Sequence, residues 1–262
     1  LLAYRCGFIT SKEYIETLSK DHVGKLATVP GRFAMSTRDS SYLAWLKLYF
    51  QSPDANNRFP SYYLKGGVVM FLLDIYIIDH SDGRFSLDDA LRGMWKRYQA
   101  DPARGMTEDE CIAIIEETTK VQVRDRLLSW LDGTVELPYT EILTAVGLTV
   151  DSASKPVTGV TFGEKVPFAA TPSPTYLGWN LADANGRIVV KTVDDGSPAA
   201  AAGIGIDDEI VAVNGRRVGS VSQVDHYLGA SIGKGAALTA HCDGRIYTTV
   251  ITPIAPPVLR LV

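Results

Sequence analysis

The sequence has 262 residues, of which 46% are hydrophobic and 21% are charged, and its formal net charge is −4 at pH 7. This is the composition of a globular protein that is long enough for two domains of ordinary size. The acidic excess argues against a nucleic-acid partner, because binding to phosphate backbones needs a basic surface.

The chain begins with Leu1, and its first residues lack the basic start, apolar core and small-residue cleavage site of a signal peptide. We therefore expect the sequence to begin inside a longer protein. The first helix signals follow at once. Gly7 ends one helical segment, and Thr10 lies three residues before Glu13, which is the spacing of a capping box ahead of an amphipathic helix.

The most apolar helix is predicted to start at residues 61–66, Ser-Tyr-Tyr-Leu-Lys-Gly, after a polar and turn-rich loop over residues 51–60. Its apolar run over residues 66–78 contains Asp74 and is shorter than the ~20 residues that cross a bilayer. We therefore predict a buried helix here, and neither a membrane span nor a membrane partner.

Further punctuation predicts that residues 1–150 form a helical domain of about seven helices without a strong strand signal. Ser86 precedes Asp89 by three residues, and Thr107 precedes Glu110 by three, so two more capping boxes are expected. The last helices of this half are predicted over residues 121–131, ending at Gly133, and over residues 139–146, starting after Pro138 and closed by Gly147.

Residues 151–174 are rich in Ser, Thr, Pro and Gly, which indicates a linker or an irregular entry segment before a second domain over residues 175–262. In that domain the pattern changes to short β-runs. Residues 177–181 and 188–193 flank Asn185-Gly186, a two-residue turn signal, so they are expected to pair as a hairpin.

The segment that follows is more specific. Gly-Ser-Pro-Ala at residues 196–199 and Gly-Ile-Asp-Asp-Glu-Ile-Val-Ala-Val-Asn-Gly at residues 205–215 predict a short helix, a strand and a tight turn. A helix over residues 222–228 and a hairpin of residues 237–243 with 245–252 complete the pattern. In this order, the segments resemble the PDZ domain of bacterial proteases.

The PDZ resemblance implies a site for the C-terminal carboxylate of a peptide ligand, which then adds as a strand. Tyr176, Leu177, Gly178 and Trp179 occupy the place of the carboxylate-binding loop, and Val224 and Leu228 that of the groove helix. A glycine at 178 is suited to the close approach of a carboxylate, although an ordinary turn glycine explains it as well. Trp179 lines either an open groove or one filled by a neighbouring domain.

The helical half resembles the second half of the catalytic domain of glycyl aminopeptidase-like zinc metallopeptidases, a gluzincin family whose members end in a PDZ domain. The segments that carry the resemblance are residues 1–9, 39–45, 61–66, 105–108 and 133–139. It implies a multidomain fold of α and β, in which the mainly helical C-terminal lobe of a thermolysin-like catalytic domain precedes a PDZ-like β-rich domain.

In this family zinc is held by two histidines of an HExxH motif and by a glutamate, and the resemblance places all three upstream of Leu1. The histidines present, His22, His80, His226 and His241, have no partner at zinc-ligand spacing and are interpreted as surface or packing residues. The scattered Cys6, Cys111 and Cys242 are interpreted as buried thiols. We therefore expect no metal or cofactor site in this chain and zinc in the parent protein.

The resemblance leaves one catalytic residue here. Tyr63, in the pattern Tyr-x-Lys-Gly at a helix start, matches the tyrosine that related enzymes present to the tetrahedral intermediate, where a phenol can donate a hydrogen bond to the oxyanion. A core or rim tyrosine is the alternative. The neighbouring Tyr62 should point about 100° away, so only one of the two is expected to face the cleft.

Two functions remain open at this stage. The parent would be a zinc metallo-aminopeptidase that removes N-terminal residues, Gly or Ala among them, from a peptide substrate, and this chain, without its upstream catalytic segment, would be inactive. Alternatively, the chain is a non-catalytic module that binds protein C-termini or docks within its own protein. An HtrA-like or tail-specific serine protease fits the helical half poorly. PDZ-bearing relatives are often exported, so a periplasmic or exported parent is expected, with a cytoplasmic one as the alternative.

Overall fold

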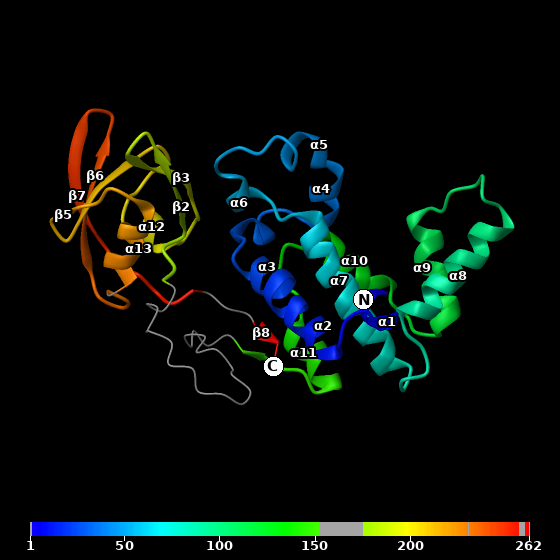
Figure 1. Cartoon of the computed structure of the whole chain (residues 1–262). Helices are drawn as coiled ribbons and strands as arrows, with labels where there is room; N and C mark the ends of the chain where they lie inside the picture. The colour runs from blue at the N-terminus through cyan, green and yellow to red at the C-terminus, as the bar shows by residue number, and fades with distance from the viewer. Residues whose placement is uncertain (1, 152–174, 230, 257–259, 262) are drawn as a thin grey trace. The chain divides into compact units, whose positions relative to one another are not determined.

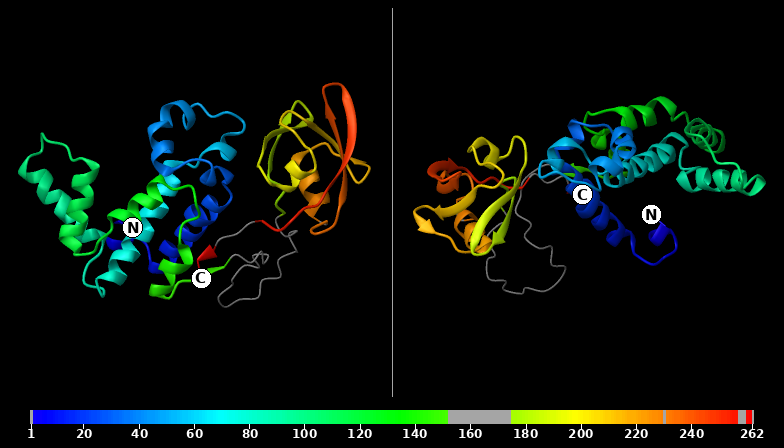
Figure 2. Two further views of the ribbon diagram at one scale, coloured as in Figure 1. Left: turned by 180° about the vertical axis from the view of Figure 1, so that it is seen from behind. Right: turned by 90° about the horizontal axis from the view of Figure 1, so that it is seen from above.

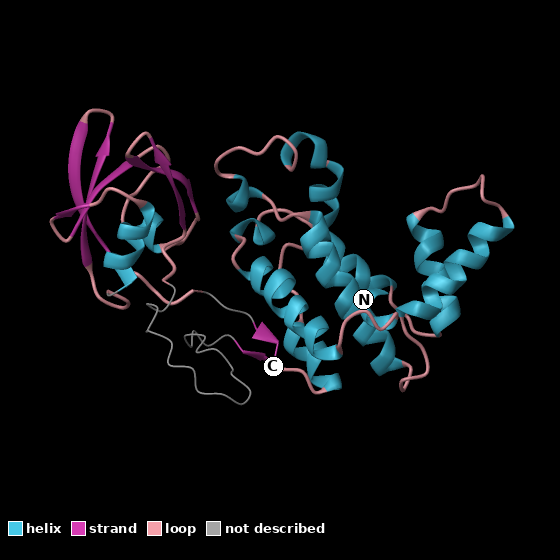
Figure 3. Cartoon of the chain, viewed as in Figure 1, coloured by secondary structure: helices cyan, strands magenta, loops and turns pink. Residues whose placement is uncertain are grey.

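The computed structural model describes residues 2–151, 175–229, 231–256 and 260–261. The chain divides into two compact units, one of Leu1–Phe50, Arg58–Asp151 and Leu259–Val262, the other of Gln51–Asn57 and Ser152–Val258 (Figure 1). Helices dominate the first unit and strands the second (Figure 3). This arrangement agrees with the predicted fold class of a helical lobe followed by a PDZ-like β-rich domain.

The first unit is built from helices of very different lengths. They are α1 (Leu2–Arg5), α2 (Ser11–Thr17), α3 (Lys25–Ala27), α4 (Thr37–Tyr42), α5 (Ala44–Lys47), α7 (Tyr62–His80), α8 (Leu87–Ala100), α9 (Glu108–Thr119), α10 (Arg124–Asp132) and α11 (Tyr139–Leu143), with the π-helix Leu18–Gly24 and the 3-10 helices Pro30–Phe33 and Thr144–Val146. The short α6 (Ala55–Arg58) lies where the chain passes between the units. Figure 2 shows from two further sides that α8 and α9 run beside each other.

The predicted capping boxes begin α2, α8 and α9. At α2, the Thr10 hydroxyl accepts from the Glu13 amide at 3.2 Å, and the Glu13 carboxylate accepts from the Thr10 amide at 2.8 Å. Such a pair satisfies two amides that a helix start leaves without partners, and a lost N-cap typically costs about 1 kcal/mol. These helix starts are local features, which is why the sequence alone predicts them.

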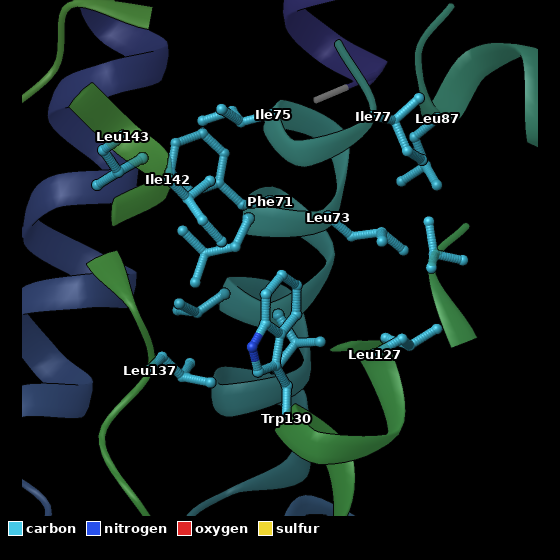
Figure 4. Close-up of a cluster of buried hydrophobic side chains, with 14 of the residues drawn as sticks. Phe71, Leu73, Ile75, Ile77, Leu87, Leu127, Trp130, Leu137, Ile142 and Leu143 are labelled. Atoms are coloured by element: carbon cyan, nitrogen blue, oxygen red, sulfur yellow. The ribbon is translucent and has the colours of Figure 1, made fainter. Parts of the chain in front are cut away.

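The core of the first unit surrounds α7. Val68, Leu72, Leu73 and Ile77 are completely buried, and α7 presents apolar side chains on every face, as expected for a central helix. Figure 4 shows side chains of α7 among those of α8, α10 and α11. The residues labelled there are Phe71, Leu73, Ile75, Ile77, Leu87, Leu127, Trp130, Leu137, Ile142 and Leu143.

Asp74, the charge in the middle of the apolar run, has a structural role. Its carboxylate accepts a hydrogen bond at 2.8 Å from the amide of Leu87, the first residue of α8, and lies 3.6 Å from the guanidinium of Arg5. Burial is the largest influence on the pKa of Asp74 and raises it above its usual value, although the Leu87 hydrogen bond and Arg5 oppose this effect. The carboxylate thus joins α7 to the start of α8 and explains an acidic residue in a buried helix.

The second unit contains an antiparallel sheet in the order β2-β3-β4-β6-β7, with β5 paired to β4. The strands are β2 (Trp179–Ala184), β3 (Arg187–Val193), β4 (Glu209–Val213), β5 (Arg216–Arg217), β6 (Ala236–Cys242) and β7 (Arg245–Ile251), and the helices are α12 (Pro198–Ala201) and α13 (Val221–Gly229). The core is made by Ile188, Val190, Ile210 and Leu238 of the sheet with residues of both helices.

Three tight turns set the strand pairing, and each has two consecutive residues with positive φ. They are Asn185-Gly186, Asn214-Gly215 and Asp243-Gly244. This geometry matches the right-handed twist of the flanking strands, and Asn, Asp and Gly tolerate it best. The predicted hairpins around residues 185–186 and 243–244 are confirmed.

Asp208 closes the turn before β4. Its buried carboxylate accepts from the Tyr247 hydroxyl at 2.6 Å and from the Gly205 amide at 2.7 Å. Burial by itself would raise the pKa of Asp208, but the hydrogen bonds from Tyr247, Gly205 and Cys242, together with His241, outweigh it, so the pKa lies below its usual value. The ionised carboxylate therefore stabilises the fold above the unfolded-state pKa of about 3.9, and this stability is lost as the pH falls through the folded-state pKa.

We expect Asp208→Asn to lower the unfolding free energy of the chain by about 1–3 kcal/mol at pH 7, because one buried hydrogen bond to a charged group is lost. The difference from the wild type should shrink as the pH falls below about 4. Urea unfolding at several pH values measures both effects, with the exposed turn residue Asp243→Asn as the control. A destabilisation that does not change with pH would contradict the role of the carboxylate charge.

Two sequence expectations are wrong. Cys6 and Cys242 are exposed thiols, and Cys111 is half-buried, so the three cysteines are not all buried. A strand, β1 (Val150–Asp151), follows the helices of the first unit and pairs in antiparallel fashion with β8 (Arg260–Leu261). Its partner lies more than a hundred residues away, and a local pattern of residues does not detect so distant a pairing.

The predicted boundaries, residues 1–150, 151–174 and 175–262, stay a prediction, and nearly all of the predicted linker lies outside the described residues. No helix in the described part of the chain has the length and apolar character needed to cross a bilayer.

Candidate functional sites

Tyr63 is the second residue of α7, at the start of a helix whose middle is largely buried. Ser61 is the N-cap, and its hydroxyl accepts from the Leu64 amide at 3.5 Å. The Tyr63 side chain is 63% exposed, so it is not a core residue. The positive end of the α7 dipole favours negative charge close to this phenol.

Tyr63 belongs to a tyrosine cluster that also contains Tyr49 and Tyr62. The hydroxyl oxygens of Tyr49 and Tyr63 are 3.3 Å apart, and the ring centroids of Tyr62 and Tyr63 are 4.1 Å apart. Hydrogen bonding with Tyr49, and to a smaller extent with Tyr62, lowers the pKa of Tyr63. The rings of Tyr62 and Tyr63 thus lie together although the residues are neighbours on a helix.

Lys65, two residues after Tyr63, fixes the start of α7. The side chain is 1% exposed, and its ammonium donates to the carbonyl oxygens of Gly133 at 3.1 Å and Arg32 at 3.4 Å. Burial lowers the pKa of Lys65. Because Gly133 ends α10, this contact fixes the first turn of α7, and with it Tyr63, to the end of another helix.

Within the residues described, no group of three or more His, Cys, Asp and Glu side chains is arranged to hold a metal ion. The ring of His80 stacks on Tyr76 with centroids 3.8 Å apart, and Nδ1 of His241 lies 3.7 Å from a carboxylate oxygen of Glu209. The residues that the structure describes therefore do not fit a zinc site.

In the second unit, the predicted carboxylate-binding loop is tied to the rest of the domain through its carbonyl groups. The Leu177 carbonyl accepts from the Ala199 amide at 2.9 Å, and the Gly178 carbonyl accepts from the Asp194 amide at 2.6 Å. Tyr176 pairs with Ile254, and its hydroxyl donates to Asp194 at 3.0 Å. The loop that joins β3 to α12 and the start of α12 thus support residues 176–178.

Gly178 has a structural reason to be glycine. Its φ is +70°, and an added Cβ would overlap the Cβ of Ser197 and lie 2.6 Å from its hydroxyl. Ser197 is the N-cap of α12 and is buried. Packing inside the domain therefore requires a residue without Cβ at 178, whether or not a ligand binds there.

Trp179 begins β2, which is the edge strand of the sheet and pairs only with β3 among the described strands. The helix α13 contacts β2, and Trp179 is half-buried beside the core. Val224 and Leu228, predicted on the groove helix, are completely buried in the core instead of being accessible at the surface. Their spacing of four residues marks the core face of α13.

Sequence reasoning missed Asn57, which belongs to the second unit with residues 51–57. Its side-chain amide donates to the Val193 carbonyl at 2.7 Å and accepts from the Asp195 amide at 2.8 Å. Asn56 donates to the Asp194 carboxylate at 2.7 Å. Polar residues in a turn-rich loop gave no signal of these contacts, because their partners lie well over a hundred residues later.

Comparison with known proteins follows the same division of the chain. Residues 1–69 match the family model for M61 glycyl aminopeptidase, and residues 175–250 match the family model for the PDZ domain. Both parts of the predicted family resemblance are confirmed. The match to the glycyl aminopeptidase model includes Tyr49, Tyr63 and Lys65, and the match to the PDZ model includes the loop at residues 176–179.

A solved structure shares the fold of this chain. An aminopeptidase N family protein from Idiomarina loihiensis matches 100% of this chain with a TM-score of 0.79 and 24% identity, and the match covers 44% of that protein. The chain thus spans less than half the length of this relative. None of the curated proteins matches it.

Two other similar structures match about a third of the chain. The HtrA3 PDZ domain bound to a phage-derived ligand matches 30% of this chain and 84% of that one, with 21% identity and a TM-score of 0.28. A serine endoprotease from Yersinia pestis matches 31% of this chain and 29% of that one, with 28% identity and a TM-score of 0.28.

Proposed function

We propose that this chain is part of a zinc-dependent aminopeptidase that removes N-terminal residues, Gly or Ala among them, from peptides, and that it adds a PDZ module to that enzyme. The match of residues 1–69 to the glycyl aminopeptidase model carries this proposal. The described residues contain no zinc site. The metal ligands would therefore come from a part of the parent protein that this chain does not include, and the chain alone would be inactive.

The contribution of this chain to the reaction would be Tyr63. Its phenol is protonated at neutral pH, and it can donate a hydrogen bond to the oxygen that becomes negative when a peptide carbonyl is attacked. The exposed position at the N-terminal end of α7 and the anchoring of that end by Lys65 support this role. Such a donor must be held in place before the reaction, and a helix fixed at its first turn meets this requirement.

An aminopeptidase assay tests the proposal. The parent protein should release Gly or Ala from glycyl and alanyl substrates, lose activity on treatment with a chelator and regain it with zinc, while the present chain should stay inactive with the same zinc. If the parent protein keeps its full activity in the presence of the chelator, zinc dependence is refuted. Turnover by the present chain with added zinc would show that the metal ligands had been missed.

The second candidate function is peptide binding by the PDZ module without catalysis. The match to the PDZ model favours it, as does the edge of β2 beside α13, which has no partner among the described strands. A peptide can add to such an edge through backbone hydrogen bonds, and its terminal carboxylate can bind amides of the loop at residues 176–179. A groove filled by another part of the protein would leave the module as an intramolecular docking domain.

Titration of the chain with peptides that have free C-termini distinguishes these roles. Binding should change the fluorescence of Trp179, and the same peptides with amidated C-termini should bind far more weakly, because the charged carboxylate is lost. A Trp179→Phe variant shows whether the fluorescence change comes from Trp179 or from the other tryptophans. If no free C-terminal peptide binds, the groove is filled or the domain is purely structural.

A further inference from the structure

Tyr49 follows α5 and lies fourteen residues before Tyr63, yet the two phenol oxygens are 3.3 Å apart. Nothing in the Tyr-x-Lys-Gly pattern refers to this residue. We propose that Tyr49 is a positioning residue for the Tyr63 phenol, which it orients by donating a hydrogen bond to it. This inference rests on the proposed role of Tyr63 in the parent aminopeptidase.

Tyr49 is itself held in place. Its amide donates to the carbonyl of Ala44, the first residue of α5, at 3.1 Å. Its ring lies against that of Trp45, with centroids 4.9 Å apart and planes inclined by 33°. Offset contacts between aromatic rings are favourable at this distance. The Tyr49 hydroxyl therefore has a defined direction although half of the residue is exposed, at 51%.

The chemistry of a phenol explains what the contact achieves. A hydroxyl group has one proton to donate and two lone pairs that accept. When Tyr49 donates to Tyr63, a lone pair of Tyr63 is occupied and the Tyr63 proton stays available for another acceptor. The same hydrogen bond polarises the Tyr63 hydroxyl and makes it a better donor.

The acid–base properties of the cluster agree with this direction of donation. Hydrogen bonding with Tyr49 is the main cause that lowers the pKa of Tyr63, and hydrogen bonding with Tyr62 adds to it. Hydrogen bonding with Tyr63 is the main cause that raises the pKa of Tyr49. A donor that stabilises the neighbouring phenolate has these two effects.

A titration of this chain tests the contact without any enzyme activity. Tyrosines labelled with ¹³C at Cζ are followed by NMR as the pH is raised, and the Tyr63 signal is assigned with Tyr63→Phe. We expect Tyr63 to ionise below the usual phenol pKa of about 10 and its pKa to rise in Tyr49→Phe. The control is Tyr42→Phe, which removes the hydroxyl of a residue that is 86% exposed on α4 and should leave the pKa of Tyr63 unchanged. If the pKa of Tyr63 is the same in Tyr49→Phe as in the wild type, the proposal is overturned.

Kinetics of the parent protein supply the second test. Tyr49→Phe should lower kcat about two- to tenfold with little change in KM, as expected for the loss of one hydrogen bond, and should lower it no further when Tyr63 is already Phe. Equal losses in the presence and absence of the Tyr63 hydroxyl would refute a positioning role. If Tyr63→Phe itself leaves kcat unchanged, the catalytic role of Tyr63 fails, whereas the titration still decides whether Tyr49 orients it.

Discussion

In the proposed parent aminopeptidase, Tyr63→Phe should lower kcat by a factor of about 10²–10³, the typical loss when one oxyanion donor is removed, and should change KM far less. The substitution removes only the hydroxyl, and Tyr63 is exposed at the start of α7, so the fold should not suffer. Steady-state kinetics with a glycyl substrate measure both constants, and the unfolding curve of the same variant verifies its stability.

The tyrosine beside it gives the closest comparison for this experiment, although its hydrogen bonding also contributes to the lowered pKa of Tyr63. Tyr62→Phe removes the same group from the neighbouring residue, whose ring lies against that of Tyr63. If Tyr62→Phe causes the larger loss of kcat, the donor is Tyr62 and the assignment must move by one residue. If neither variant affects kcat, this chain contributes no oxyanion donor from the start of α7.

The second large effect is expected at Gly178. Gly178→Ala should lower the unfolding free energy of the chain by about 2–5 kcal/mol, because a left-handed backbone costs an alanine about 1–2 kcal/mol and overpacking against Ser197 costs a further 1–3 kcal/mol. Chemical denaturation measures this loss. Gly196→Ala is the control, since Gly196 has φ +71° but no atom within 4 Å of the added Cβ. Gly196→Ala should therefore lose only the stability that the left-handed backbone costs, about 1–2 kcal/mol.

A double-mutant cycle separates packing from ligand binding at this glycine. Ser197→Gly removes the two nearest atoms that the new Cβ would meet and leaves the Tyr176 hydroxyl at 3.0 Å, so it should restore part of the stability that Gly178→Ala loses. A Gly178→Ala protein that is as stable as Gly196→Ala but no longer binds peptide would instead show that the glycine serves the ligand. The two explanations for Gly178 therefore give opposite results.

Local sequence patterns were sufficient for the elements that local chemistry determines. The capping boxes at Thr10, Ser86 and Thr107 and the turns at Asn185-Gly186 and Asp243-Gly244 need only residues within a few positions of one another. These capping boxes and turns are found in the structure where the sequence predicted them. The motif that led to Tyr63 is equally short, and the catalytic role of Tyr63 stays a prediction.

Contacts between distant residues were not predictable in this way. Tyr49 reaches Tyr63 only because the segment after α5 lies beside the start of α7 in the folded unit. Ser197 fills the space beside Gly178 only after the domain has folded, and β1 pairs with residues more than a hundred positions later. The burial of Val224 and Leu228 follows from the packing of α13 on the sheet. Each of these contacts depends on tertiary structure, and a pattern of neighbouring residues does not show which distant residues will meet.

The buried ammonium of Lys65 has a consequence for the chemical behaviour of the protein. Reagents and enzymes that modify lysine side chains need an accessible and deprotonated amine, and folding withholds this one from solvent while two carbonyl groups hold its protons. Acylation at Lys65 would therefore require the first turn of α7 to separate from the end of α10. The rate of acylation at Lys65 therefore measures how often the first turn of α7, which carries Tyr63, separates from the end of α10.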